Sequence, residues 1–552
     1  MSELTIVFRL RFAVAVSAAL CLVFVFAARD AFAEEGIPAE YIVQMEPGVT
    51  PSQGQQVVAD LGGQLTTGEV PVINGFGAVL QDDAAEELVN TPGVHAVTPN
   101  SVTAPEPAAT VPAPNNATAA SGGLRCALSD AGTVPSRLGS TSLLDVNPLN
   151  AIPLLRQPLQ VTVRADRAWQ RATGRGVGVA VLDTGIAGDL PDFVTAGKSR
   201  VIATAVTNPC ARNANDQVGH GTHVAGLIAG NSMNATSLKK LQGKYMGIAP
   251  RANLISVKVS DDDGDTTVLD VINGLQFVVD HKADLGIRVV NLSLSSTVAE
   301  SYKTDPLDAA VEAAWFSGIV VVAAAGNDGS LPDAVSYSPG NDPFAISVGA
   351  LDDRGSTRLD DDQLASWSSR GVTQDGVQKP ELLAPGTRLI APLAPNSDFE
   401  RLCRRCMISH SYFQLSGTSM ATAVVSGAAA LVIEKNPAMT PNQVKGALLS
   451  TLRPVPGVGA ALDTNAALDG SGSANAGLVP NPLVDPTTGA IDWTRASFRR
   501  ASFRDAAGSP FSALWARASF RCDCGLDASG EVDANRVSFR RVSFRRTVDF
   551  NR

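Results

Sequence analysis

Three residues with catalytic potential stand at the junctions between apolar strands and small-residue helices. Asp183 ends the apolar segment VGVAVLD, His220 lies in GHGTHVAG, and Ser419 lies in SGTSMATA, where an alanine-rich segment begins. An aspartate at the edge of a buried sheet needs a partner, which a histidine N–H can supply. A serine at a helix N-terminus lies beside free backbone N–H groups, which suit a developing oxyanion. These residue types indicate nucleophilic catalysis by a serine.

The segment 159–470 has the pattern of a domain that can position such residues. Apolar runs alternate with helical segments, and runs that are apolar on both faces are typical of parallel strands covered by helices on both sides. Sites in such doubly wound α/β sheets form at the carboxyl ends of the strands. We expect strands at VGVAVLD, NLISVKV, VVNLSLS, IVVVAAAG and AISVGA, and helices at GTHVAGLIAG, TVLDVINGLQFVVDHKA, DPLDAAVEAAWFSG and SMATAVVSGAAALVIEK.

The motifs VAVLDTGI, GHGTHVAGLIAG and GTSMATAVVSG, in this order, resemble those of the subtilisin-like serine proteases, the subtilases of peptidase family S8. The resemblance implies a mostly parallel sheet flanked by helices, and a serine-type endopeptidase that cleaves peptide bonds through an acyl-enzyme. It implies that His220 is the general base for Ser419 and that Asp183 orients the imidazole. We interpret His223, three residues into the helix, as a packing or hydrogen-bonding residue.

Asn327 is the candidate for a further catalytic group. It follows the apolar run IVVVAAAG, in the segment AAGNDG. The resemblance implies that its side-chain amide lies opposite the backbone N–H of Ser419 and that the two form an oxyanion hole. The alternative is an asparagine that only shapes the turn.

The resemblance also places an extended substrate beside the segment NLSLSS, where it adds a strand through main-chain hydrogen bonds. The candidate substrate-binding residues are Ser293, Leu294, Ser295, Ser296 and Tyr337. Ser295 and Ser296 stand where two glycines are usual in the family. Tyr337 stands near the expected pocket floor, where relatives often have a small residue. These departures predict a narrower cleft and an altered first subsite.

Chemistry of this kind requires no cofactor, but relatives commonly bind structural calcium. Asp192 is a candidate calcium ligand, because the family often has one nine residues after the catalytic aspartate. The acidic segment SDDDGDTT (260–267) lacks the spacing and the terminal glutamate of an EF-hand loop. We interpret it as a solvated turn near the substrate cleft.

Residues 34–103 have a small α+β pattern, with strands at YIVQMEPG, INGFGAVL and VHAVTPN and helices at PSQGQQVVADLGGQL and DDAAEELVNT. They resemble the inhibitor-type (I9) propeptide of subtilases, on the segments YIV (41–43), INGF (73–76) and PGVHAVTPN (92–100). The resemblance implies a ferredoxin-like unit that assists folding, plugs the cleft as an intramolecular inhibitor and is removed by self-cleavage. A generic ferredoxin-like module is the alternative.

The N-terminal segment 1–33 has the features of a signal peptide. Arg9 and Arg11 precede the apolar run 12–28, and Ala-Phe-Ala at 31–33 is a small-residue cleavage site. This predicts secretion, to the extracellular space, the periplasm or the cell envelope; a permanent anchor is the alternative. Residues 104–158 begin with a Pro/Ala-rich stretch, which is typical of a linker, and continue as an N-terminal extension.

Six cysteines follow the signal segment, and an oxidising compartment favours disulfides between them. Sequence alone leaves fifteen pairings open. The alternative is a zinc site built from two closely spaced pairs. The cysteines are Cys126, Cys210, Cys403, Cys406, Cys522 and Cys524.

The C-terminal extension, 471–552, contains RASFR and RVSFR repeats. Its part from 491 onward has twelve arginines against seven acids, a formal charge of +5, whereas the rest of the chain has −15. Paired hairpins about the double arginines would place alanine or valine and phenylalanine on one face. We expect such hairpins to dock on the acidic catalytic domain or on an anionic envelope surface; a disordered basic tail is the alternative.

The net charge of −10 argues against general nucleic-acid binding. The resemblance implies protein or peptide substrates as the partners. A binding protein on the same scaffold and an esterase are the alternative functions. The Asp-His-Ser set is intact, and the G-x-S-x-G elbow of α/β-hydrolases is absent around Ser419. Both observations favour the peptidase.

Overall fold

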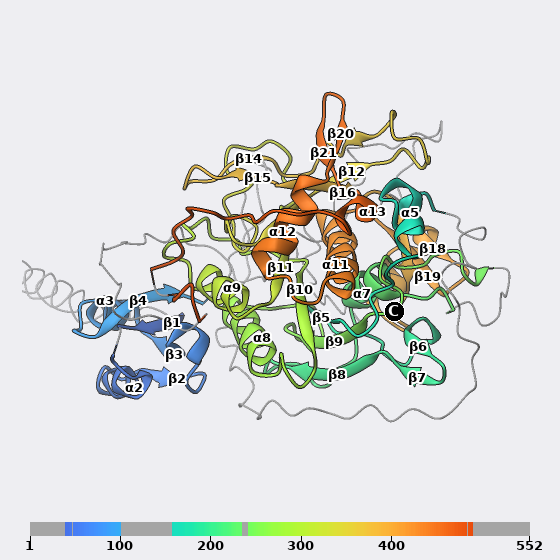
Figure 1. Cartoon of the computed structure of the whole chain (residues 1–552). Helices are drawn as coiled ribbons and strands as arrows, with labels where there is room; N and C mark the ends of the chain where they lie inside the picture. Colours follow the sequence, from blue (N-terminus) through green and yellow to red (C-terminus); the bar gives the residue numbers. More distant parts are fainter. Residues whose placement is uncertain (1–38, 47, 101–156, 234–240, 483, 489–552) are drawn as a thin grey trace, which may run out of the picture.

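A mostly parallel sheet forms the centre of the computed structural model, which describes residues 39–46, 48–100, 157–233, 241–482 and 484–488 (Figure 1). In these residues the sheet has ten strands, ordered β20-β21-β16-β12-β11-β10-β5-β9-β8, with β13 paired to β12. All neighbours from β16 to β8 run parallel. The strands are β5 (Gly178–Asp183), β8 (Val201–Val206), β9 (Asn253–Lys258), β10 (Ile287–Leu292), β11 (Val320–Ala324), β12 (Ile346–Asp352), β13 (Gln363–Leu364), β16 (Leu382–Pro385), β20 (Arg453–Val455) and β21 (Gly459–Ala461).

Two helix pairs flank this sheet: α7 packs against α11, and α8 packs against α9. Helix α11 is buried along nearly its whole length, which fits a sequence that is apolar or small on every side. The α/β fold class is therefore confirmed. The helices are α5 (Leu159–Thr162), α6 (Ala165–Ala168), α7 (His220–Ala229), α8 (Val268–Asp280), α9 (Pro306–Phe316), α10 (Asp398–Leu402), α11 (Thr418–Lys435), α12 (Pro441–Ser450) and α13 (Thr464–Ala467).

Short strands and single turns complete the larger unit. Three of the strands form a separate antiparallel sheet, in the order β17-β19-β18. The elements are β6 (Val194–Thr195), β7 (Lys198–Ser199), β14 (Gly371–Val372), β15 (Gln378–Lys379), β17 (Leu389–Pro392), β18 (Met407–Ile408), β19 (Tyr412–Leu415), η3 (Pro191–Phe193) and η5 (Arg404–Cys406).

A second, smaller unit lies beside α8 and α9 (Figure 1). Its antiparallel sheet has the order β2-β3-β1-β4, and its own core includes Val43, Val58 and Phe76. The expected strands and helices of this unit are confirmed, and the short β2 was missed. The elements are β1 (Ala39–Met45), α2 (Pro51–Asp60), β2 (Gln64–Leu65), η1 (Pro71–Ile73), β3 (Gly75–Leu80), α3 (Asp82–Val89) and β4 (Val94–Pro99).

The small unit contacts the larger one through η1 and through its last residue described. Val72 and Ile73 join the core of the larger unit. The backbone N–H of Val72 donates to Gln276 Oε1 on α8 at 2.5 Å. Asn100 Oδ1 accepts from the backbone N–H of Leu269, in the first turn of α8, at 3.0 Å.

Several predictions fall on residues that the structure does not describe. These are the signal segment 1–33, the linker up to residue 156, the arginine repeats after residue 488, and Cys126, Cys522 and Cys524. None of the helices in the described ranges is long and apolar enough to cross a membrane.

Helix α9 carries a cluster of buried carboxyl groups. Asp305 caps its N-terminus, and Asp308 and Glu312 follow on later turns, both fully buried. Burial raises the pKa of Asp308 and Glu312 well above the usual range, and nearby carboxylates raise both further. Burial also raises the pKa of Glu300 to about 8 and that of Asp342 to about 7. Some of these groups therefore hold protons at neutral pH.

The chain after α13 seals this cluster. The backbone N–H of Asn481 donates to Glu312 Oε2 at 2.7 Å, and its side-chain amide donates to the carbonyl of Tyr302 at 2.9 Å. The Tyr302 hydroxyl in turn donates to the carbonyl of Val479 at 2.8 Å. Residues 479–481 thus cover one face of α9 and shield it from water.

These raised pKa values predict that the protein loses stability as the pH rises. The folded chain binds more protons than the unfolded chain above the unfolded pKa of about 4, so the free energy of unfolding falls between about pH 5 and pH 9. Urea unfolding of a Ser419→Ala chain across this range measures the slope. Asp308→Asn should reduce the slope of the free energy of unfolding against pH. The control Asp280→Asn, at an exposed position, should leave this slope unchanged. An equal slope in all three chains would contradict the role of the cluster.

Candidate active site

Asp183 and His220 form a buried hydrogen-bonded pair. Asp183 is the last residue of β5, and His220 is the first residue of α7. The His220 Nδ1 atom lies 2.8 Å from Asp183 Oδ1 and 3.0 Å from Oδ2, and both side chains are 1% exposed or less. Asp183 Oδ1 also accepts from the backbone N–H of Thr184 at 2.8 Å. This geometry suits an imidazole whose Nδ1 carries the proton, which leaves Nε2 as the basic atom.

Ser419 lies in the first turn of α11 and is tied to the end of β10. Its Oγ donates to the carbonyl of Ser293 at 3.2 Å, and Ser293 Oγ donates to the carbonyl of Ser419 at 3.0 Å. Asn291 Nδ2 donates to Ser293 Oγ at 2.8 Å, so the strand and the helix form one polar network. This network fixes the serine at the carboxyl end of β10.

The strand register places these two anchors side by side. In the parallel pair of β5 and β10, Ala180 lies opposite Val290, and Val181 lies opposite Asn291. Two residues further on, the same register puts Asp183 level with Ser293. His220 is bonded to the first of these residues and Ser419 to the second, so β5 and β10 carry the two side chains at the same edge of the sheet.

Asn327 follows β11, the neighbour of β10 on its other side. Its Oδ1 accepts from the backbone N–H of Thr418 at 3.0 Å and from the Thr418 hydroxyl at 3.1 Å. Because Thr418 binds the amide oxygen, the amide NH₂ group faces away from Thr418. The side chain is thereby fixed beside the N-terminus of α11, one residue before Ser419.

A second buried carboxylate, Asp216, supports the Asp183–His220 pair. Asp216 Oδ1 accepts from Thr184 Oγ at 2.8 Å and from the N–H of Gly219 at 2.7 Å, and Oδ2 accepts from the N–H and the hydroxyl of Thr222 at 2.8 and 2.6 Å. Burial raises the pKa of Asp216, and these four hydrogen bonds oppose the shift. The sequence analysis missed this residue, because NDQVG reads as an ordinary polar loop.

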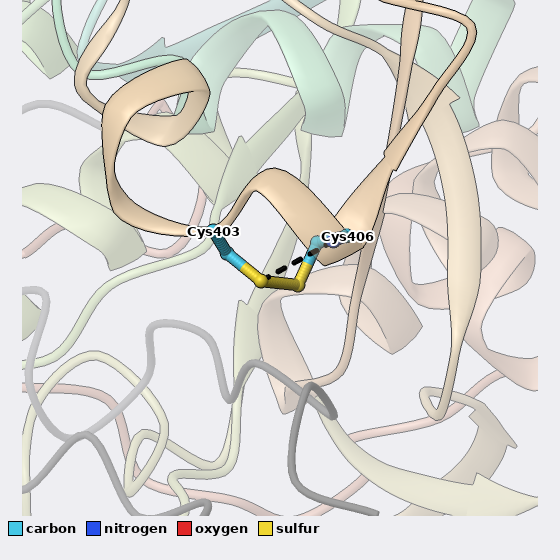
Figure 2. The surroundings of a disulfide bond; sticks show 2 residues. All are labelled: Cys403 and Cys406. Carbon is cyan, nitrogen blue, oxygen red and sulfur yellow. Dashed lines mark hydrogen bonds between the residues drawn. A yellow bond between two sulfur atoms is a disulfide. The ribbon is translucent and has the colours of Figure 1, made fainter.

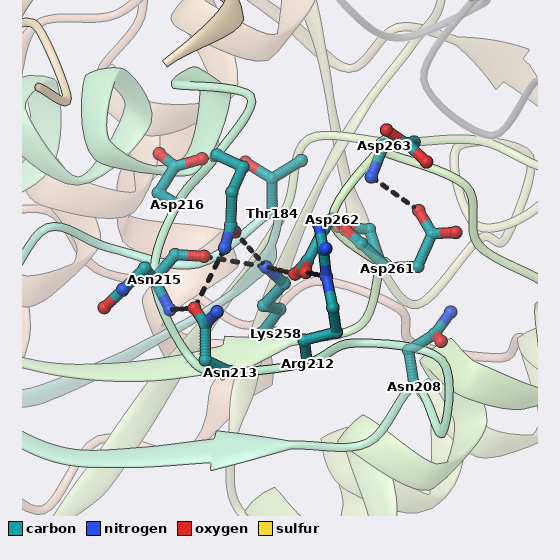
Figure 3. A network of polar contacts seen from close by, with 12 residues as sticks. Thr184, Asn208, Arg212, Asn213, Asn215, Asp216, Lys258, Asp261, Asp262 and Asp263 are labelled. Atoms are coloured by element: carbon teal, nitrogen blue, oxygen red, sulfur yellow. Dashed lines mark hydrogen bonds and ion pairs between the residues drawn. The ribbon is translucent and has the colours of Figure 1, made fainter. Parts of the chain in front are cut away.

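Lys258 is hydrogen-bonded to the loop 215–217, which precedes His220 (Figure 3). The fully buried Lys258 Nζ donates to the carbonyl of Asn215 at 2.7 Å and to Gln217 Oε1 at 2.6 Å, and pairs with Asp262 at 3.0 Å. Burial alone would raise the pKa of Asp262, but Arg212 and Lys258 lower it. The loop 215–217 is therefore held by a charged residue of β9.

A model of the subtilase family matches residues 174–476. The chain belongs to the subtilase family. It is 41% identical over 285 residues to the serine protease AprX of Bacillus subtilis, which covers 50% of this chain and 62% of that one. It is 34% identical over 298 residues to thermitase of Thermoactinomyces vulgaris, over 54% and 88% of the two chains.

The crystal structure of fervidolysin from Fervidobacterium pennivorans, described as a keratinolytic enzyme related to subtilisin, shares the fold. The TM-score is 0.52 at 22% identity, over 79% of this chain and 62% of that one. The match between this subtilase and AprX spans about 62% of the length of AprX and 50% of the length of this chain.

In this subtilase the candidate substrate segments lie against each other. The backbone N–H of Ser296 donates to the carbonyl of Ser338 at 2.6 Å, and Tyr337 forms a bridge with Ala299. Tyr337 is 7% exposed, and its hydroxyl donates to Asp333. Ser295 is also buried, and Leu294 is fully buried in the core. The segment 293–296 and Tyr337 are therefore brought together, and their role in substrate binding stays a prediction.

His223 is a structural residue. It is fully buried, and its Nε2 lies 3.0 Å from the carbonyl of Phe413. Burial lowers the pKa of His223 to about 3, so the ring is neutral. The expected packing and hydrogen-bonding role is confirmed.

Asp192, the candidate calcium ligand, is fully buried. Its Oδ1 accepts from the Tyr412 hydroxyl at 3.2 Å, and its carbonyl accepts from Arg200 Nη2 at 2.7 Å and from the N–H of Asn231 at 3.0 Å. A calcium-binding role for this residue stays a prediction. No group of three or more histidine, cysteine or acidic side chains in the described ranges is arranged to hold a metal.

The acidic segment 260–267 is a turn after β9, as predicted, but it is not solvated throughout, because Ser260, Asp262 and Thr266 are buried. Asp261 Oδ1 accepts from the backbone N–H groups of Asp263 and Asp265 at 3.0 and 2.8 Å (Figure 3). Burial raises the pKa of Asp261 to about 6. The Asp261 carboxylate thus stabilises the turn by accepting these two backbone hydrogen bonds.

Loss of the Asp216 carboxylate should strongly destabilise this subtilase. Asp216→Ala leaves four buried donors without their acceptor, which costs about 3 kcal/mol or more in the free energy of unfolding. Asp216→Asn retains the shape and one acceptor oxygen, so it should cost less. Urea unfolding at pH 7, with Asp189→Ala as an exposed control, measures both. Equal stability of Asp216→Ala and wild type would contradict the network.

Proposed function

We propose that this subtilase is a secreted serine endopeptidase that is made as a self-processing zymogen. The observation that carries the proposal is the shared edge of β5 and β10, where His220 is bonded to Asp183 and Ser419 to Ser293. The family relationship supports the same reaction, since AprX and thermitase align with this region. Protein or peptide chains are the proposed substrates.

Peptide cleavage would begin with attack of Ser419 Oγ on the substrate carbonyl carbon. His220 Nε2 accepts the hydroxyl proton, and Asp183 stabilises the imidazolium through Nδ1. The tetrahedral intermediate collapses when His220 returns the proton to the leaving amine, which yields an acyl-enzyme. Water then repeats the sequence: His220 takes its proton, the hydroxide attacks the ester, and Ser419 regains its proton as the acid product leaves.

The developing oxyanion needs donors near Ser419. Asn327 is held by Thr418 through its amide oxygen, and its NH₂ group is the first proposed donor. The backbone N–H of Ser419, in the first turn of α11, is the second donor. The segment 293–296 would pair with the extended substrate, while the buried Tyr337 narrows the adjoining pocket. A preference for small side chains in the first subsite follows from this proposal.

The small unit within 34–103 is proposed as an intramolecular inhibitor. Val72 and Ile73 pack on the larger unit, and Asn100 is bonded to α8. Self-cleavage is proposed to take place after residue 103, at the end of this unit. Segment 1–33 remains the proposed export signal, and contact between the arginine-rich tail and an anionic envelope surface remains a prediction.

No cofactor takes part in these steps. A structural calcium bound by Asp192 remains a prediction.

Removal of the nucleophile should abolish both activity and maturation. Ser419→Ala should accumulate as a precursor that retains residues 34–103, because the proposed cut requires its own serine. Mass spectrometry of the purified chain measures the cut, and a fluorogenic peptide with a serine-directed covalent inhibitor measures activity. Ser450→Ala, at the distant end of α12, is the matched control. Maturation of pure Ser419→Ala would show that another protease makes the cut.

Removal of the oxyanion donor should lower turnover while substrate binding is retained. Asn327→Leu should reduce kcat by about 10²–10³-fold with little change in KM, the loss that the equivalent change produces in subtilisin. Steady-state kinetics on a peptide amide and on the matching ester test this. Unchanged kcat would mean that Asn327 only shapes the turn, and cleavage of the ester alone would favour an esterase.

A further inference from the structure

The segment 397–406, here called the clamp, lies between β17 and β18 and contacts the residues before His220. The backbone N–H of Asp398 donates to the carbonyl of Gln217 at 2.8 Å, and that of Phe399 donates to the carbonyl of Val218 at 3.2 Å. These two hydrogen bonds bind the clamp to the loop that ends at Gly219, immediately before the catalytic histidine. The clamp is therefore bonded to the residues that directly precede α7.

Phe399 continues this contact to the imidazole itself. Its ring is 1% exposed and meets the His220 ring edge-on, with centroids 6.5 Å apart and an angle of 83°. The other side of Phe399 stacks on Phe413 at 5.2 Å and 18°. The backbone carbonyl of Phe413 lies 3.0 Å from His223 Nε2, so each histidine of α7 contacts one of these two phenylalanines.

The approach at Gly219 leaves no room for a side chain. Gly219 has a φ of +103°, and a Cβ there would lie 2.9 Å from Ser397 Oγ and 3.1 Å from the Phe399 ring. The clamp is thus packed directly on the backbone that precedes His220.

A disulfide lies at the C-terminal end of the clamp (Figure 2). Cys403 and Cys406 are bonded to each other, and the backbone N–H of Cys406 donates to Cys403 Sγ at 3.2 Å. The backbone N–H of Cys403 donates to the carbonyl of Phe399 at 3.4 Å. Helix α10 has five residues, too few to be stable alone, so the crosslink joins its end to η5 and β18. This pairing also removes both thiols from the zinc alternative.

We propose that the clamp is a positioning element for His220 and that the Cys403–Cys406 disulfide keeps it closed. The inference deepens the proposed function and rests on it. Phe399 does not touch the reacting atoms; it fixes the plane of the imidazole that must accept the proton of Ser419. An open clamp should therefore lower kcat, while KM stays close to that of the closed form.

Opening the clamp is a two-electron reduction. A dithiol reductant attacks the disulfide, the S–S bond breaks, and two electrons and two protons produce the thiols of Cys403 and Cys406. The reductant becomes a cyclic disulfide. Reoxidation reverses the change, so the effect on kcat should be reversible.

The test uses the purified enzyme after self-processing. It compares the kcat and KM of the oxidised and reduced forms on a fluorogenic peptide. Reduction with dithiothreitol should lower kcat about 10-fold or more with less than a twofold change in KM, because misplacement of a catalytic group by a fraction of an ångström has effects of this size. Cys403→Ser/Cys406→Ser should have the low kcat from the start and should not respond to dithiothreitol. Cys210→Ser, which leaves the clamp disulfide intact, should respond as wild type does.

Two further variants separate positioning from folding. Phe399→Ala should lower kcat in the oxidised enzyme, and Phe399→Leu, which retains apolar bulk, should recover most of it. Melting temperatures and alkylation mapped by mass spectrometry identify unfolding and the thiols reduced. An unchanged kcat after reduction of this disulfide, or a rise in KM alone, overturns the proposal. If the oxidised enzyme is inactive and is not labelled by a serine-directed reagent, the proposed function itself fails.

Discussion

The parallel register of β5 and β10 is the constraint on which the site depends. With Ala180 opposite Val290, the residues that anchor His220 and Ser419 end level on adjacent strands. A shift by one residue would turn alternate side chains to the other face of the sheet and separate the anchors. The register is secure because both strands are largely buried and mostly apolar: Asp183 ends β5, and the polar residues of β10 are Arg288 and Asn291. The apolar core therefore determines the geometry of the chemistry.

Buried carboxylates are stabilised in two different ways in this molecule. Asp183 and Asp216 accept several hydrogen bonds each, so their geometry is tightly defined. Asp308 and Glu312 on α9 instead have strongly raised pKa values, since desolvation and neighbouring acids oppose their ionisation. The first arrangement orients His220, the proposed general base. The second makes the stability of the domain depend on proton concentration.

The sequence predicts the parts of the site that depend on local pattern. The strand that ends at Asp183 and the helix that begins near Ser419 are continuous apolar or small-residue runs, so their ends could be predicted. Strand β8 was not predicted, although its sequence VIATAV is apolar except at Thr204; it lies at the edge of the sheet, where Ile202 is exposed. Asp216 and Phe399 were missed for another reason: each acts through residues distant in sequence, which meet only in the folded chain. No spacing rule connects the charged segment DFERLCRRC with the histidine that it supports.

The contact between Asn100 and Leu269 bears on how the small unit is held on the larger one. If the two separate as proposed, water satisfies the backbone amide of Leu269 and the side-chain amide of Asn100 equally well, so this hydrogen bond adds little to the net affinity. Burial of Val72 and Ile73 accounts for most of the attraction. The polar contacts instead fix the orientation in which the unit docks. Affinity and orientation are therefore carried by different residues, and sequence changes can alter either one separately.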